Sequence, residues 1–330
     1  MSAQVVIVSP VLADANNGNW QTARRWQRFL APRFPARIVR AWPDAAAAGD
    51  RIMLALHARR SASSIAAWYQ AHAARLAVIL TGTDLYRDIQ TDAAAQASLR
   101  FAQALVVLQE CGSQALPADL HEKTRVIFQS TTTRRQLLKP TRHLRALMVG
   151  HLREEKSPDT LFAAARRLVQ HHDILIDHIG DPLDPELGVA AQATAANCPH
   201  YRWLGGLPHV ATRRRIQQAH VLVHASKMEG GAHVVMEAIA SGTPVLASRI
   251  DGNVGMLGAD YAGYFAWGDA RQLAALLVQC RTGQHEPDGL LAQLADQCRQ
   301  RAPLFIPALE RSAVQGLVGD LLQLQQIQRM

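Results

Sequence analysis

The stretch SKMEGGAHVVMEAIASGTPVLAS, residues 226–248, decides the fold expected for this chain. It follows the apolar run HVLVHAS, which is typical of a buried strand, and it closes on a second apolar run, TPVLAS. Between the two runs, residues 232–241 have the composition of a helix that stops at Gly242. A strand, a glycine-rich turn, a helix and another strand in this order form one unit of a parallel α/β sheet.

The same alternation of strand and helix recurs along the chain. The N-terminal half contains the short β-branched runs VVIVSP, RIMLALHA, LAVILTGTD, ALVVLQE and RVIFQS, with helical spacing over 20–31 and 61–74. The pattern restarts with LRALMVGHL and DILIDHIGD after a linker, LKPTRH, near 140–145. We therefore predict an α/β protein with an N-terminal domain over 1–143, a second domain over 144–309 and a final helix over 310–330.

Composition narrows the class of protein. The chain has 330 residues, 48% hydrophobic and 19% charged, as expected for a soluble globular protein, and no apolar run of about 18 residues that predicts a membrane span. The four cysteines are scattered without metal-ligand spacing, which favours free thiols in the cytoplasm. The net charge of +8 suits small anions, whereas arginine pairs without interleaved aromatic residues do not favour nucleic acid.

The glycine-rich turn has the character of a phosphate site. Gly230 and Gly231 precede a helix whose first amides lack partners within the helix, and without a Cβ they allow an anion to approach closely. Glu229 stands at the edge of this site, and Glu237, more than one turn inside the helix, can accept hydrogen bonds from hydroxyls. A phosphate flanked by hydroxyls describes a nucleotide sugar. A capped surface helix with two solvated acids is the alternative.

A second turn carries matching charge. The stretch LMVGHLREEKSPDTLFAAARRL, 147–168, has a strand, a glycine turn and an amphipathic helix, and its turn holds His151, Arg153 and Lys156. Basic groups at this place can neutralise a diphosphate, although an ordinary charged loop has the same composition. Both stretches in one α/β domain favour the nucleotide-sugar interpretation. The chain has no Asp-x-Asp pair to hold a divalent metal on a diphosphate, so we expect neither a metal nor a cofactor.

Residues 144–270 resemble the donor-binding domain of the retaining GT-B glycosyltransferases that have a Glu-x7-Glu motif, here Glu229 and Glu237. The resemblance implies two Rossmann-like domains facing a cleft, with the last helix crossing back to the N-terminal domain. It implies that Glu237 holds the ribose hydroxyls, that Glu229 faces the donor hexose and that Lys156 contacts the diphosphate. Amides near Gly231, Ala232 and His233 face the diphosphate or the sugar in this interpretation.

Three places depart from that family. One is the pair Gly231–Ala232, where the family has an aromatic residue followed by glycine. His151 stands where the family has an arginine for the diphosphate, and Arg153 is the alternative candidate for this role. The run DGNVG, 251–255, lacks the glutamate of the corresponding family turn.

One subgroup matches more of the chain. The runs NGNWQTARRW, LTGTDLYRD, VGHLREEK, MEGGAHVVMEA and SRIDGNVGMLGADYAGYF resemble the selenosugar synthases of bacterial selenoneine biosynthesis. This resemblance implies transfer of the sugar of UDP-N-acetylglucosamine or UDP-glucose to selenophosphate, which gives a 1-seleno sugar. The identity of the sugar, retention or inversion at the anomeric carbon, and the oligomeric state are left open.

The loops after the N-terminal strands suit an anionic acceptor, since they offer small donors and arginines instead of aromatic platforms. We expect Glu229, Lys156 and Asp84 to be catalytic. A solvated surface charge is the alternative for each arginine, and a core histidine is the alternative for His57. The residues expected to bind the acceptor are Gly18, Asn19, Thr22, Arg25, His57, Thr81, Gly82, Thr83 and Arg87.

Three other functions remain compatible with these residues. The first is a glycosyltransferase that acts on a sugar, lipid or natural-product acceptor. The second is a non-catalytic protein that binds a nucleotide sugar. The third is a sugar-nucleotide epimerase, which needs no acceptor.

Overall fold

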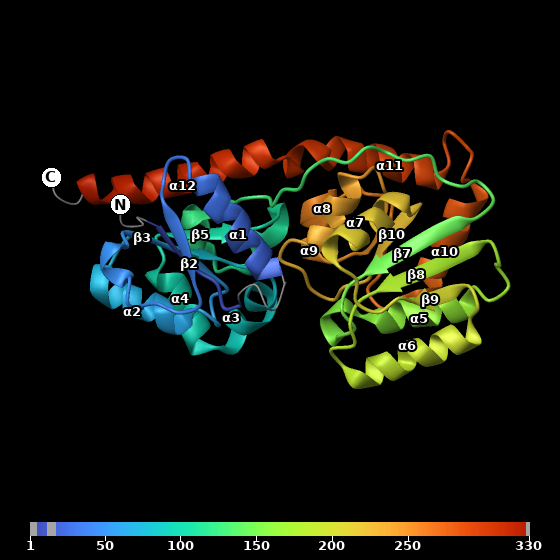
Figure 1. Ribbon diagram of the computed structural model, residues 1–330, viewed down its shortest axis with the longest axis horizontal. Coiled ribbons are helices and arrows are strands. Elements are labelled where there is room, and N and C mark those ends of the chain that lie inside the picture. The colour runs from blue at the N-terminus through green and yellow to red at the C-terminus, as the bar shows by residue number, and fades with distance from the viewer. Residues whose placement is uncertain (1–4, 12–17, 328–330) are drawn as a thin grey trace. The chain divides into compact units, whose positions relative to one another are not determined.

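The computed structural model of the chain describes residues 5–11 and 18–327. The chain forms two compact units (Figure 1). Unit 1 comprises Met1–Ser130 with Pro307–Met330, and unit 2 comprises Thr131–Ile306, whereas the sequence predicted 1–143, 144–309 and 310–330. The segment 131–143 has no strand or helix, and it is bonded to unit 2, where the Arg134 amide donates to the Ala240 carbonyl at 2.8 Å. Each unit contains a parallel six-stranded sheet, which confirms the predicted pair of Rossmann-like α/β domains.

The sheet of unit 1 has the strand order β2-β1-β3-β4-β5-β6. Its strands are β1 (Val5–Val8), β2 (Ala36–Val39), β3 (Ile52–Leu56), β4 (Leu76–Ile79), β5 (Ala104–Val107) and β6 (Thr124–Val126). Its α-helices are α1 (Gly18–Leu30), α2 (Ala62–His72), α3 (Ile89–Thr91), α4 (Ala93–Phe101) and α12 (Pro307–Ile327). Short helices of tighter or wider winding are η2 (Ala47–Gly49), η3 (Asp84–Asp88), η4 (Glu110–Ala115) and η5 (Ala118–Lys123).

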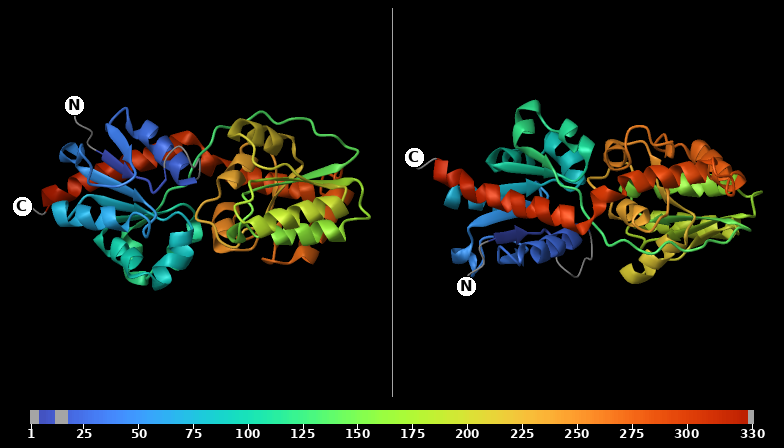
Figure 2. Two further views of the ribbon diagram at one scale, coloured as in Figure 1. Left: turned by 60° about the horizontal axis from the view of Figure 1, so that its bottom comes forward. Right: turned by 90° about the horizontal axis from the view of Figure 1, so that it is seen from above.

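Alternation along the strands gives unit 1 two hydrophobic layers. Val5 and Ile7 of β1 point to one face of the sheet, and Val6 and Val8 point to the other, because successive side chains of a strand alternate. The first layer receives α1 and α12, and the second receives α2 and α4. Figures 1 and 2 show α12 running along the unit beside α1. The last helix therefore completes a layer that the N-terminal residues begin.

The sheet of unit 2 has the strand order β12-β11-β10-β7-β8-β9. Its strands are β7 (Leu144–Val149), β8 (Ile174–Ile179), β9 (Tyr201–Trp203), β10 (Val221–His224), β11 (Val245–Ser248) and β12 (Tyr264–Phe265). Its helices are η6 (Glu154–Lys156), α5 (Pro158–Arg167), α6 (Pro185–Asn197), α7 (His209–Gln218), α8 (His233–Ile239), α9 (Asp251–Leu257), α10 (Ala270–Thr282), α11 (Leu290–Arg301) and η7 (Ala302–Phe305).

Local sequence signals set several helix starts in unit 2. Asp184 precedes Pro185, and its carboxylate accepts from the amides of Glu186 and Leu187, while Asp269 caps α10 through the Gln272 amide. Helix α8 has no such side-chain cap, and it covers 233–239 instead of the predicted 232–241. Its position depends more on neighbouring elements than on its own ends.

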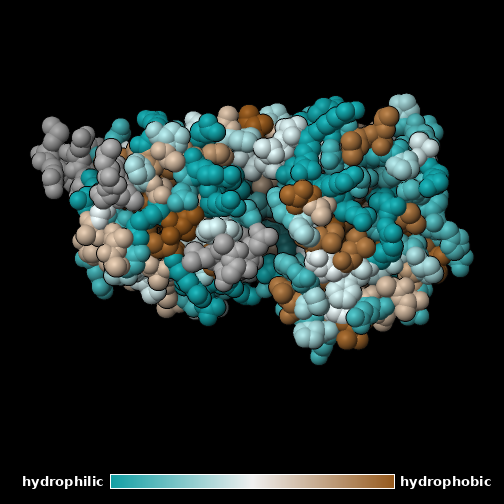
Figure 3. All heavy atoms as spheres, viewed as in Figure 1, coloured by the Kyte–Doolittle hydropathy of each residue, from teal (hydrophilic) through white to brown (hydrophobic). Residues whose placement is uncertain are grey.

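Figure 3 shows how hydrophobic and hydrophilic residues are distributed on one face of the molecule. Hydrophobic residues are scattered among hydrophilic ones on the face shown in Figure 3. Within the described part of the chain, no helix is both long and apolar enough to cross a bilayer.

Two buried histidines are expected to lower the free energy of unfolding at acidic pH. Burial lowers the pKa of His178, which lies 3.0 Å from the Tyr201 hydroxyl, and the pKa of His220 to about 4 each, against an ordinary 6.5. The unfolded chain therefore binds more protons than the native chain between pH 6.5 and 4. The free energy of unfolding is expected to fall as the pH is lowered through this window, by about 3 kcal/mol for each histidine, and to be independent of them above it.

Urea unfolding at pH 7 and pH 4.5 measures this effect. His178→Gln removes one titrating group and keeps a polar partner for Tyr201, so the variant should lose less stability between the two pH values. The exposed His172→Gln is the control and should behave as the native chain does. Equal acid sensitivity of all three proteins would contradict the assignment.

Candidate functional site

The order of the strands in unit 2 has one point of reversal. Strand β7 lies between β8 and β10, so the chain moves outward from β7 in one direction through β8 and β9 and in the other through β10, β11 and β12. Loops that leave β7 and β10 at their carboxyl ends diverge, and in parallel α/β sheets ligands bind at this point of reversal. These two loops, 150–156 and 225–232, hold the turns of the two stretches singled out in the sequence, 147–168 and 226–248.

An ion pair joins the two loops. The Nζ atom of Lys156 lies 2.5 Å from Oε1 of Glu229, and the side chains are only 17% and 11% exposed. His224, the last residue of β10, brings its Nε2 atom to 3.2 Å from the same oxygen. Burial raises the pKa of Glu229, but the charge of Lys156 and the contact with His224 outweigh this and hold that pKa far below its ordinary value. Glu229 is therefore an ionised carboxylate at neutral pH that can accept hydrogen bonds from hydroxyls.

The glycine-rich entry to α8 lies beside this pair. Gly230 and Ala232 are buried, whereas Gly231 and His233 are partly accessible. The Ala232 amide donates to Sδ of Met256 at 3.1 Å, so this predicted ligand for an anion already has a weak acceptor.

Glu237 occupies the middle of α8 and is 7% exposed. Its Oε1 atom accepts a hydrogen bond from Nε2 of His209 at 2.7 Å and lies 3.4 Å from Nη1 of Arg213. Both partners belong to α7, and neither was predicted as a site residue. Their spacing of four residues, which places them on one face of a helix, is the signal that the sequence offered.

His151 and Arg153 lie on the same loop as Lys156. Nδ1 of His151 accepts from the Asp181 amide at 3.1 Å and lies 3.5 Å from the Asp181 carboxylate at the end of β8. Burial is the main cause that lowers the pKa of His151. Arg153 is 45% exposed, with its Nε 3.9 Å from Glu155. The choice between these two residues for a diphosphate stays a prediction.

The backbone of Glu229 packs closely against a glycine of α9. A Cβ atom on Gly252, in the first turn of α9, would lie 2.1 Å from the backbone oxygen of Glu229. Only glycine lets these two backbones approach so closely.

Gly252→Ala is expected to displace Glu229 from Lys156. On the prediction that Glu229 faces the sugar of a nucleotide-sugar donor, this should lower turnover by about 100-fold, because a shift of about 1 Å at a reacting site costs that much. Steady-state kinetics measures the loss. Gly316→Ala, in α12, is the matched control, since its added Cβ meets no atom within 4 Å. Undiminished turnover in the Gly252 variant would show that the position of Glu229 does not matter.

In unit 1 the structure brings together five of the predicted residues after β3 and β4. Asp84 is buried, and its carboxylate accepts from the amides of Ala58 (2.9 Å), Thr81 (2.8 Å) and Gly82 (3.0 Å). Nε2 of His57 lies 3.1 Å from the Thr83 hydroxyl. Asp84 thus ties the two loops together, and its predicted catalytic role has no further support from these contacts.

His57 itself adopts an unusual backbone. Its φ of 73° is a strained conformation for a residue with a side chain, and such strain is concentrated at functional sites. Burial lowers its pKa, although the nearby Asp84 and Asp88 act in the opposite direction. Arg87, also predicted, is 51% exposed and lies 3.1 Å from Asp88.

The predicted residues of α1 form a separate group. The Thr22 hydroxyl donates to the Gly18 carbonyl at 2.8 Å and accepts from the Gln129 side chain, and Asn19 is partly accessible. Arg25 is 12% exposed and donates through Nε to Glu310 of α12 at 2.7 Å. Glu310 was not predicted. The loop before α1, over 12–17, lies outside the described residues.

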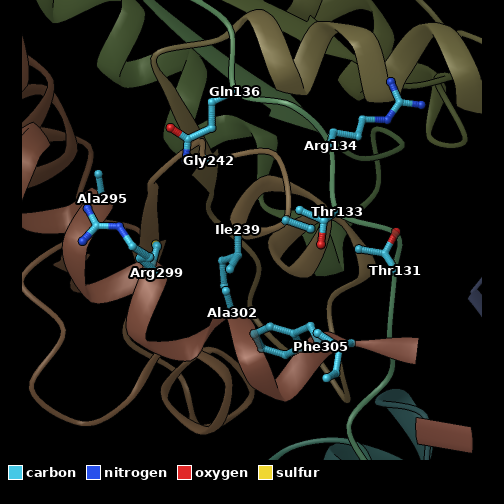
Figure 4. Close-up of a pocket in the computed structure, with 13 residues that line it drawn as sticks. Thr131, Thr133, Arg134, Gln136, Ile239, Gly242, Ala295, Arg299, Ala302 and Phe305 are labelled. Atoms are coloured by element: carbon cyan, nitrogen blue, oxygen red, sulfur yellow. The ribbon is translucent and has the colours of Figure 1, made fainter. Parts of the chain in front are cut away.

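The described residues form no cluster of three or more His, Cys, Asp or Glu side chains that could hold a metal ion. A cavity of about 240 Å³ in unit 2 is bordered by the end of α8, the 131–136 segment and α11. None of the predicted donor residues lines it. In Figure 4 the side chain of Arg134 points away from the centre of this cavity.

Comparison with protein families decides the class of unit 2. Residues 129–287 match the model described as glycosyl transferases group 1. Unit 2 carries a glycosyltransferase domain. The domain spans the β7 and β10 loops, so Lys156, Glu229 and Glu237 all belong to it. No curated protein matches the chain.

Solved structures extend the likeness from the glycosyltransferase domain to the whole fold. A glycosyltransferase from Rickettsia africae superposes with a TM-score of 0.75 at 13% identity, covering 98% of this chain and 99% of its own. The sucrose-phosphate synthase of Thermosynechococcus elongatus gives 0.73 at 17%, covering 100% and 98%. For TarM of S. aureus the values are 0.64 and 13%, and this chain spans 55% of its length. Both units together therefore have the predicted GT-B fold.

Proposed function

We propose that this chain transfers a sugar from a UDP-sugar to selenophosphate, with the donor bound in unit 2 and the acceptor in unit 1. The observation that carries the donor half is the ion pair of Lys156 and Glu229 at the point of reversal of a glycosyltransferase domain. An ammonium group stabilises a departing diphosphate, and an ionised carboxylate accepts from sugar hydroxyls. Lys156, Glu229 and Glu237 act on the donor in this proposal.

Structures with the same fold support a uridine nucleotide. The Anabaena protein HepE is known in complex with UDP and glucose, and the pneumococcal O-GlcNAc transferase GtfA in complex with UDP and GlcNAc. The donor proposed here is UDP-N-acetylglucosamine or UDP-glucose.

The acceptor half rests on the resemblance to the selenosugar synthases and on the chemistry of the loops in unit 1. These loops carry Arg87, the strained His57 and the TGTD turn over 81–84. In the reaction, the bond from the anomeric carbon to the diphosphate oxygen breaks, and UDP leaves with the electron pair. A selenium lone pair of selenophosphate forms the new carbon–selenium bond. Water then releases phosphate from selenium, which leaves the 1-seleno sugar.

Mass spectrometry of the full chain with UDP-N-acetylglucosamine, or UDP-glucose, and selenophosphate tests the proposal. A seleno sugar and free UDP are expected, with slower reaction of thiophosphate and little of phosphate. A reaction without acceptor detects hydrolysis or epimerisation. If no seleno sugar forms while a carbohydrate or lipid acceptor is glycosylated readily, the assignment of selenophosphate as the acceptor is wrong. The enzyme then transfers the sugar to another class of acceptor.

Arg87 is the better probe of the acceptor than Arg25, because Arg25 is bonded to the buried Glu310. Arg87→Ala should lower turnover with selenophosphate and leave the affinity for UDP within about twofold, since Arg87 acts on the acceptor and not on the nucleotide in this proposal.

A further inference from the structure

Arg213 is an arginine in an unusual place. It lies on α7, its side chain is only 4% exposed, and the neighbouring Arg214 is exposed. A guanidinium removed from water is costly unless acceptors surround it. Arg213 has three: the Thr131 hydroxyl, the Thr132 carbonyl at 3.0 Å and Oε1 of Glu237 at 3.4 Å. It therefore links the middle of α8 to the first two residues of unit 2.

The two side chains that contact Glu237 differ in how firmly they are held. His209 is 53% exposed at the start of α7, so an arriving ligand can displace it. Arg213 is buried and anchored on Thr131 and Thr132. Both contacts end on Oε1, and among residues 5–11 and 18–327 no hydrogen bond to Oε2 of Glu237 is found. Arg213 thus fixes one carboxylate oxygen and leaves the other for a ligand.

The anchor is itself fixed. The Thr131 amide donates to the Phe305 carbonyl at 3.1 Å, and both residues border the cavity shown in Figure 4. Helix α8 has seven residues and no side-chain cap, so the direction of Glu237 is not set by the helix alone. The guanidinium, with its rigid fork of donors, sets it from outside.

We propose that Arg213 is a positioning residue, which holds Glu237 so that the free carboxylate oxygen receives the ribose hydroxyls of the nucleotide donor. This inference rests on the proposed function, because it takes Glu237 to be the ribose ligand. It assigns to α7, which the sequence left without a role, control over how strongly the protein selects a ribose with its hydroxyls.

Calorimetric binding of UDP and of 2′,3′-dideoxy-UDP to the full chain tests the proposal. The native protein should bind UDP at least about tenfold more tightly than the dideoxy analogue, which corresponds to about 1.4 kcal/mol. Arg213→Met should weaken UDP by about tenfold and change the analogue by less than twofold, so that the two affinities converge. Arg213→Lys should restore part of the difference, since a lysine supplies charge without the fork.

Two further variants keep the test decisive. Arg214→Met, at the exposed neighbouring position, should bind both ligands as the native protein does. Thr131→Val removes one anchor without introducing a buried gap, and it should reduce the preference for UDP even if Arg213→Met does not fold.

The outcomes separate the inference from the function it rests on. Equal weakening of both ligands in Arg213→Met, or an unchanged preference in Arg213→Met and Thr131→Val, overturns the role of Arg213 while the ribose site stands. A native protein that binds both ligands equally overturns the assignment of Glu237 in the proposed function, and this inference with it.

Discussion

Replacing Lys156 with methionine is expected to lower turnover of the UDP-sugar by about 100-fold or more. Lys156 lies 2.5 Å from Glu229 and is proposed to stabilise the departing diphosphate. Removing one group that stabilises developing charge typically costs about 100- to 1000-fold in kcat. The same change also leaves the buried Glu229 without its main counter-ion, which should cost about 3 kcal/mol of stability. Steady-state kinetics and urea unfolding measure the two effects separately.

A double variant separates catalysis from folding. Lys156→Met combined with Glu229→Gln removes both charges, so stability should return while turnover stays low. Lys227→Met is the matched control, because Lys227 lies in the β10 loop but pairs with the exposed Glu154 at 2.8 Å. It should change turnover by less than about twofold. Recovery of turnover in the double variant would mean that Lys156 only neutralises Glu229.

Glu310→Ala is expected to produce the largest loss of stability in unit 1. Glu310 is 1% exposed and accepts from Nε of Arg25, Nε1 of Trp26 and the amide of Ser130, each at 2.7 Å. The Ser130 hydroxyl donates to the same carboxylate at 2.5 Å. Alanine leaves a buried guanidinium without its carboxylate, and breaking a buried ion pair on one side costs about 3–5 kcal/mol. Urea unfolding at pH 7 measures the change.

The control lies on the same helix. Asp320 pairs with Arg125 at 2.5 Å, but the two side chains are 52% and 44% exposed. Exposed pairs contribute at most about 1 kcal/mol, so Asp320→Ala should have little effect. If both variants unfold at the same urea concentration, the buried network does not hold α12 in place.

The fold could be predicted because strands and helices leave local patterns of apolar residues in the sequence. The four residues Val5–Val8 are all buried, as expected for a strand covered on both faces, and the helices predicted at 20–31 and 61–74 form as α1 and α2. The sequence placed Lys156 and Glu229 in two loops of one α/β domain by the same reasoning, since both residues follow the ends of parallel strands. Their ion pair was not predicted and is seen only in the structure.

The remainder of the site depends on contacts between residues far apart in the sequence. Such contacts produce no periodic pattern of residues near either partner. Arg25 and Glu310 are 285 positions apart, and nothing near either residue in the sequence indicates the other. The sequence therefore assigned Arg25 to an acceptor and did not identify Glu310. Arg213 was missed for a related reason: its partners lie on a segment without regular structure and on α8. The sequence around Arg213 would look the same if its side chain were exposed to solvent.

The division of unit 1 into two pieces of chain has a consequence for synthesis on the ribosome. The residues up to Ser130 emerge first, yet Val314, Leu317 and Leu321 of their hydrophobic layer and the buried Glu310 belong to α12. Unit 2, whose entry and exit are joined by the bond from Thr131 to Phe305, is made in one uninterrupted passage between them. Domains fold as units during translation, so unit 2 can close while the nascent first unit still exposes an apolar face. This face of unit 1 is covered only after α12 has been synthesised.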